Sequence, residues 1–77
     1  MPRLTPVPWS VLECIFLRFG FRYDRTKGDH NAYVKSGVLR PVIIPKYPEI
    51  DIEIIKSNMK TAGMSRDEYF AFLDLCK

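Results

Sequence analysis

The order of patterns along the chain predicts an α+β domain in which helices cover one face of a three-stranded antiparallel sheet. Three observations predict it. Apolar residues at helical spacing precede residue 20, strand-like runs separated by glycine turns fill residues 21–44, and two helical segments with capping residues follow residue 50. At 77 residues, we expect one domain over residues 1–77 with the element order α-β-β-β-α-α.

The first helix is predicted from Pro8 to Phe19. Proline is tolerated in a first helical turn, and Gly20 is expected to cap the C-terminal end. The apolar stripe that defines this helix consists of residues three and four positions apart, namely Leu12, Ile15, Phe16 and Phe19.

Three strands are expected next, joined by local connections that favour a meander. Lys27-Gly28-Asp29 forms the first turn and Ser36-Gly37 a tight second one. Pro41 belongs at a sheet edge or bulge, because it has no N–H to donate to a ladder. The predicted strands cover Phe21–Arg25, Asn31–Lys35 and Val38–Ile44.

Two helices are expected in the last third of the chain. Asp51 is a suitable N-cap for a helix that ends at Gly63 and carries Ile52, Ile55 and Met59 on one face. Ser65 and Glu68 have the spacing of a capping box. The helix that they begin contains Tyr69, Phe70, Phe72, Leu73 and Cys76.

Composition and charge narrow the class of function. With 47% apolar and 27% charged residues, the chain is not of the disordered class. Residues 1–47 carry eight basic and three acidic groups, net +5, whereas residues 48–77 carry four basic and six acidic groups, net −2. A basic half favours a nucleic-acid backbone or an acidic protein as partner. A chain this small favours an active site on an open surface rather than in a deep cavity.

The expected compartment is the cytoplasm. No apolar run is long enough to span a membrane, and the first six residues lack the order of a signal peptide. Cys14 and Cys76 stand alone near opposite ends without the spacing of a zinc site, so both are interpreted as reduced, packed thiols. One histidine cannot complete a familiar metal cluster, and we expect no cofactor.

His30 is the one histidine and the strongest candidate for chemistry. It lies beside a glycine turn and near Lys27 and Lys35. Imidazole exchanges protons near neutrality, and the ammonium groups would attract a phosphate. The alternative is a solvated or hydrogen-bonded structural histidine. Strand alternation also places His30 on one face with Ala32 and Val34, which are predicted to point into the core; only a bulge or a position at the strand's start would turn it outward.

The chain resembles the HicA toxins, small messenger-RNA interferases with a fold like the double-stranded RNA-binding domain, from about Pro6 to Leu73. The resemblance rests on four short motifs in order. They are Phe-Gly-Phe at the end of the first helix (Gly20, Phe21), Lys-Gly-x-His (Lys27, Gly28, His30), Val-x-x-Pro-Lys (Val42, Pro45, Lys46) and Ala-Gly-x-Ser-x-x-x-Tyr (Ala62, Gly63, Ser65, Tyr69).

This resemblance implies a toxin of a type II toxin–antitoxin pair acting in stress response: a metal-independent endoribonuclease (hydrolase) with His30 as catalytic residue. The implied partners are messenger RNA and a HicB-type antitoxin, through which the toxin oligomerises.

Two departures from the family's usual residues bear on activity. Asp29 stands where the family commonly has serine, and Tyr47 stands where it often has histidine. Asp29 would either orient the imidazole or repel phosphate, and tyrosine is a much weaker acid than imidazolium.

The chemistry that fits one histidine is transfer of the phosphoryl group to the RNA's own 2′-hydroxyl, with His30 as general base. Tyr33 and Tyr47 would stack on bases, donate to the leaving oxygen, or belong to the core. The expected RNA- or phosphate-binding residues are Arg25, Lys27, Gly28, Lys35, Lys46 and Tyr47.

Two alternatives are a non-catalytic RNA-binding module and a protein-binding adaptor that uses the open sheet face. Duplex-binding domains carry lysines at the start of the helix after the sheet, where this chain has acidic residues over 49–53.

Overall fold

The computed structural model describes residues 3–77, so the first two residues of the predicted domain lie outside it. The element order is α-β-β-β-α-α, as predicted, and the sheet is antiparallel with the strand order β1-β2-β3. The architecture is that of the double-stranded RNA-binding-domain-like fold. The elements are α1 (Trp9–Arg18), β1 (Arg22–Lys27), β2 (His30–Val34), β3 (Val42–Pro45), α2 (Ile52–Ala62) and α3 (Arg66–Cys76).

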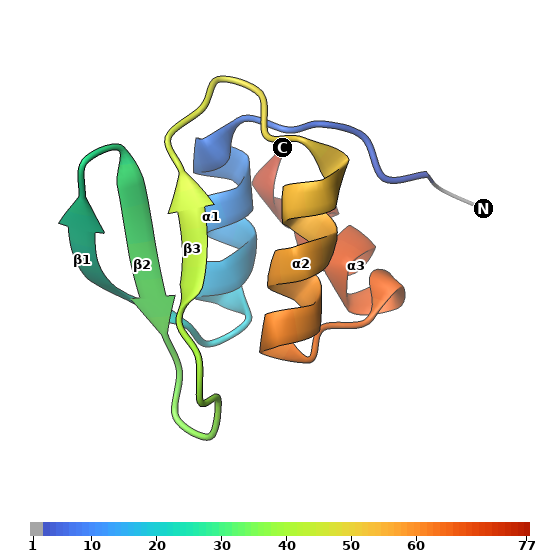
Figure 1. Cartoon of the computed structure of the whole chain (residues 1–77). Helices are drawn as coiled ribbons and strands as arrows, with labels where there is room; N and C mark the ends of the chain where they lie inside the picture. The colour runs from blue at the N-terminus through green and yellow to red at the C-terminus, as the bar shows by residue number, and fades with distance from the viewer. Residues whose placement is uncertain (1–2) are drawn as a thin grey trace.

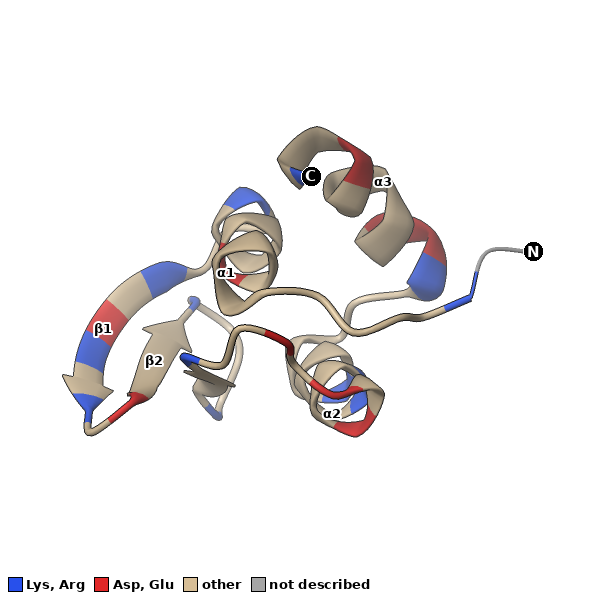
Figure 2. Ribbon diagram, turned by 90° about the horizontal axis from the view of Figure 1, so that it is seen from above, with Lys and Arg blue, Asp and Glu red and all other residues tan. Residues whose placement is uncertain are grey.

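The helices form layers beside the sheet and do not all cover it. α1 packs on one sheet face, α2 runs along β3, and α3 packs chiefly on α1, farthest from the strands (Figures 1 and 2). The core between these layers is apolar, with Leu12, Ile15 and Phe16 of α1 fully buried. Within residues 3–77, the opposite sheet face carries no helix.

The helix ends follow the capping residues seen in the sequence. Ser65 and Glu68 form the predicted capping box, and Asp51 caps α2 by accepting from the N–H of Ile52. Gly20 follows α1 with φ +108°, and the N–H of Phe21 donates to the carbonyl of Phe16, as in a Schellman motif. Gly63 ends α2 in the left-handed conformation, as predicted.

The second strand connection differs from the prediction. β3 begins at Val42 rather than Val38, so a loop over residues 35–41 replaces the tight Ser36-Gly37 hairpin. Pro41 has no N–H for the ladder, and it directly precedes the strand instead of lying within it. The outer edge of β3 is partly covered by α2, because the side-chain amide of Asn58 donates to the carbonyl of Ile43 at 3.1 Å.

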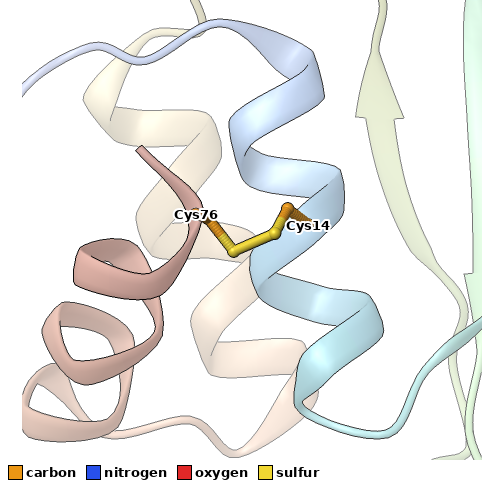
Figure 3. Close-up of a disulfide and its surroundings, with 2 residues drawn as sticks. All are labelled: Cys14 and Cys76. Atoms are coloured by element: carbon orange, nitrogen blue, oxygen red, sulfur yellow. A yellow bond between two sulfur atoms is a disulfide. The ribbon is translucent and has the colours of Figure 1, made fainter.

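The prediction of two reduced thiols is wrong. Cys14 of α1 and Cys76 of α3 form a disulfide with their Cα atoms 5.8 Å apart (Figure 3). The two residues are 62 positions apart, and only the packing of α3 on α1 brings them together. Sequence spacing alone carried no information about this contact.

Candidate active site on the open sheet face

The hairpin turn between β1 and β2 brings His30 next to a lysine. Gly28 has φ +63°, and no non-glycine residue of the described chain has a positive φ, so the two-residue Gly28-Asp29 turn fits type II′. This turn makes Lys27 and His30 the last cross-strand pair of the β1–β2 ladder. Directly opposite side chains in such a pair lie on the same sheet face, about 5 Å apart at their Cβ atoms.

The imidazole points away from the core. Asn31 and Tyr33 are the residues of β2 that face α1, so His30 lies on the open face, and its side chain is 46% exposed. The interpretation that His30 shares a core-directed face with Ala32 and Val34 is therefore wrong. The alternation has the opposite phase, because the polar residue Asn31 is buried through hydrogen bonds, while Ala32 is covered by longer neighbours on the open face.

Asp29 contacts the imidazole. Its Oδ1 lies 2.8 Å from Nδ1 of His30, and both side chains are partly exposed. A carboxylate at Nδ1 holds the ring proton there and leaves Nε2 as the proton-accepting nitrogen. The contact is the one expected if Asp29 orients the imidazole.

A β-bulge places a second cation on the same face. The register shifts between Tyr23 and Arg25, so that Asp24 is the extra residue and Arg25 pairs with Ala32. Without the bulge, Arg25 would share the face of Tyr23. With it, Arg25 and Lys27 both project beside His30 from β1, whose basic residues are visible in Figure 2. A shallow hollow of about 370 Å³ is lined by Arg25, Lys27, His30, Ala32 and Ile43.

A second hollow begins at the other side of the imidazole. This β3–α2 groove has a volume of about 510 Å³, and its lining includes His30, Ile43, Tyr47 and residues of α2. The ring of Tyr47 meets that of His30 edge to face, with the centroids 6.3 Å apart. His30 thus separates a basic hollow from a less basic groove, and both are open to solvent.

Backbone hydrogen bonds hold Tyr47 in place. Its carbonyl accepts from the N–H of Trp9 at 3.1 Å, which ties the loop after β3 to the start of α1. The N–H of Lys46 donates to the carbonyl of Asp29 at 2.7 Å, which fixes the same loop to the hairpin turn. The turn, His30 and Tyr47 therefore form one connected unit.

The ammonium groups of two predicted site residues lie on aromatic rings outside the two hollows. Nζ of Lys46 lies 5.7 Å from the ring centroid of Trp9, and Nζ of Lys35 lies 4.1 Å from that of Phe19. Neither lysine lines a hollow beside His30. Lys35 also packs its aliphatic chain over Gly20, so its contacts are those of a structural residue at the opposite end of β2.

Tyr33 belongs to the core. Its side chain is fully buried and its hydroxyl donates to Glu13 of α1, while Asn31 donates to the same hydroxyl at 3.1 Å. Burial raises the pKa of Tyr33 well above its usual range, and the bond to Glu13 adds to the shift. Tyr33 therefore takes no part in stacking on bases, whereas Tyr47 remains available at the surface.

Sequence reasoning missed the contribution of α2 to this surface. Glu53, Ser57 and Thr61 recur every four residues and line the groove together with Arg40 of the β2–β3 loop. The four-residue polar spacing was the signal, because such residues share one side of a helix.

Within residues 3–77, no group of three His, Cys, Asp or Glu side chains is arranged to hold a metal ion, and no helix there is long and apolar enough to cross a membrane.

The structure is thus a small α+β domain that carries an exposed histidine beside two basic side chains on its open sheet face. Comparison with known families gives a match: the model of the HicA toxins of bacterial toxin–antitoxin pairs matches residues 9–64 of the 77. The chain belongs to this family and therefore has the role of a toxin with a cognate antitoxin. No curated protein matches the chain significantly.

Proposed function

We propose that this toxin is a metal-independent endoribonuclease that cleaves messenger RNA in the cytoplasm, with His30 as its general base. The observation that carries the proposal is the contact of Asp29 Oδ1 with His30 Nδ1 at 2.8 Å on a face that also carries Arg25 and Lys27. This combination supplies a directed base and a phosphate-binding surface in one place.

In the proposed reaction, Nε2 of His30 removes the proton of a ribose 2′-hydroxyl, and the 2′-oxygen attacks the adjacent phosphorus. The bond to the 5′-oxygen of the next nucleotide breaks, and that oxygen takes up a proton. A 2′,3′-cyclic phosphate and a 5′-hydroxyl end result. Lys27 and Arg25 stabilise the charge that builds up on the phosphoryl oxygens. Deoxyribose lacks the attacking hydroxyl, so DNA would not be cleaved.

The Gly28 turn would serve this reaction by keeping Lys27 and His30 adjacent, and Tyr47, whose ring meets that of His30, would contact the leaving group or a base. The HicB-type antitoxin would inhibit by covering the basic face around His30 and would assemble toxins into a larger complex. Masking of this kind requires complementary charge and no change of the toxin's fold.

The test is expression of the wild-type toxin without its antitoxin, compared with His30→Ala. We expect the wild type to slow growth and degrade messenger RNA, and the alanine variant to accumulate as folded, harmless protein. An equally toxic His30→Ala would remove His30 from the mechanism. If the wild type binds RNA and does not cleave it, the result would favour a non-catalytic RNA-binding module. If it binds the antitoxin and neither binds nor cleaves RNA, the result would favour a protein-binding adaptor.

A reducing cytosol keeps most thiols reduced, so the proposed reaction in the cytoplasm would proceed with the Cys14–Cys76 bond open. Alkylation of free thiols at the moment of lysis, followed by mass measurement, gives the redox state of Cys14 and Cys76 inside the cell.

A further inference from the structure

We propose that the β3–α2 groove is a nucleobase subsite, which holds the base of a nucleotide next to the cleaved phosphate and prefers guanine. This inference rests on the proposed ribonuclease function and names the part of the substrate that the groove takes. The volume of about 510 Å³ lies within the range of ligand-binding pockets.

The floor and rim of the groove suit a flat aromatic ring. Ile43, Pro45 and Ile54 provide an apolar lining, and the Tyr47 ring stands beside it. Ile43 is 39% and Tyr47 is 40% exposed, so this apolar surface is left uncovered immediately next to His30. Base–aromatic stacking in such a place is worth about 1–3 kcal/mol per base.

The charge at the Glu53 end of the groove does not suit a phosphate. Glu53 is the acidic residue of the groove lining, and Arg40 is the residue that is always cationic. They lie towards opposite ends, because α2 starts beside the segment that follows β3 and finishes beside the β2–β3 loop, which carries Arg40 (Figure 1). The cations beside His30 line the other hollow instead. A nucleotide chain would therefore place its phosphate at Lys27, its base in the groove, and a further phosphate near Arg40.

Glu53 gives the subsite its preference. An ionised carboxylate only accepts hydrogen bonds, and its two oxygens match two adjacent donors. Guanine presents two such donors, N1–H and the N2 amino group, whereas the pairing edges of adenine and cytosine offer one amino group and that of uracil one N–H. Ser57 and Thr61, one and two turns further along α2, add hydroxyl groups on the same side.

Mononucleotides test this subsite without any cleavage. The ¹⁵N-labelled toxin is titrated with GMP, AMP, CMP and UMP, with ribose 5-phosphate as the base-free control. We expect GMP to shift the amide signals of Ile43, Ser57 and Thr61 and to bind about tenfold more tightly than AMP, in line with one bidentate pair. Ribose 5-phosphate should shift only the signals around Lys27 and His30. Equal groove shifts with ribose 5-phosphate, or equal affinity for all four bases, would overturn the inference.

Two substitutions on α2 make the test specific. Ser57→Tyr fills the groove and should weaken GMP binding at least tenfold. Lys56→Tyr adds the same ring at a neighbouring exposed position outside the groove and should leave GMP binding unchanged.

Glu53→Gln should remove the preference for GMP over AMP, and Glu49→Gln, its control, should keep that preference. Equal GMP binding by Ser57→Tyr and Lys56→Tyr would overturn the subsite. The subsite would also be overturned if the amide signals of the groove shifted when the antitoxin is added and did not shift with any of the four nucleotides. Absence of RNA cleavage by the wild type would refute only the proposed function.

Discussion

Asp29 Oδ1 lies 2.8 Å from His30 Nδ1, and in the proposed mechanism this contact orients the imidazole. Asp29→Ala should therefore lower the cleavage rate about tenfold to a hundredfold, as part of the 10²–10⁴-fold that a positioned general base contributes. The measurement is the rate constant on a short RNA. Asp74→Ala removes an exposed carboxylate on α3 and should cleave at the wild-type rate. A faster Asp29→Ala would mean that the carboxylate chiefly repels phosphate.

Chelation should leave the reaction unchanged. The proposed step uses an imidazole and the substrate's own hydroxyl, so cleavage in excess EDTA should match the untreated rate. The products should carry a 2′,3′-cyclic phosphate, or the 3′-phosphate formed from it, which mass spectrometry identifies. Strict dependence on added magnesium would contradict the mechanism, since the ion would then have to activate the nucleophile or stabilise the phosphate.

Three variants of Tyr47 separate its possible roles. A phenol is a poor proton donor at neutral pH, so if Tyr47 has replaced an acid, Tyr47→His should raise the rate and give a bell-shaped pH profile. If it stacks a base beside His30, Tyr47→His brings no acceleration, Tyr47→Phe is tolerated, and Tyr47→Ala weakens RNA binding by about 1–3 kcal/mol. Equal rates and affinities for all three variants would assign Tyr47 to neither role.

Reduction of the disulfide should destabilise the fold without disabling the site. The bond closes a loop of 62 residues, for which the chain-entropy model gives about 4 kcal/mol. Urea unfolding with and without reductant measures this difference, and the Cys14→Ser/Cys76→Ser double variant should be insensitive to reductant. Because α3 lies beyond α1 from the sheet, cleavage below the unfolding transition should be unaffected (Figure 1).

Two buried phenols should make stability fall at alkaline pH. Burial raises the pKa of both Tyr33 and Tyr69, so the folded state holds their protons more tightly than the unfolded chain does. The two phenols contribute fully to the free energy of unfolding below pH ~10, the ordinary pKa of a phenol. This contribution is lost as the pH rises towards their pKa values in the folded state. Unfolding free energies measured from pH 8 to 11.5 should show this decline, and a smaller one in Tyr69→Phe.

The same tyrosines should differ at neutral pH. The Tyr69 hydroxyl is buried without a hydrogen-bond partner among residues 3–77, so Tyr69→Phe should be neutral or stabilising. Tyr33→Phe removes the bond to Glu13 and leaves Asn31 without its acceptor, at a cost of about 1–3 kcal/mol. Equal destabilisation by both substitutions would contradict the different environments of the two hydroxyls.

Local patterns in the sequence determined the element order, the helix caps and the position of His30 beside a glycine turn. These features depend on residues within a few positions of one another, such as Ser65 with Glu68 or Gly28 with its neighbours. The family resemblance rests on the same kind of short motif, so it too depends on local sequence and not on how the helices and strands pack.

The tertiary structure alone decided which side chains meet. The Asp24 bulge reverses the alternation of β1 and brings Arg25 beside His30, while buried hydrogen bonds let Asn31 rather than Ala32 face the helices. The Cys14–Cys76 bond joins residues 62 positions apart, and the β3–α2 groove brings His30 of β2 to the same surface as Glu53 and Thr61 of α2. Such contacts depend on how whole elements pack, and the residues adjacent to each partner in the chain carry no record of them.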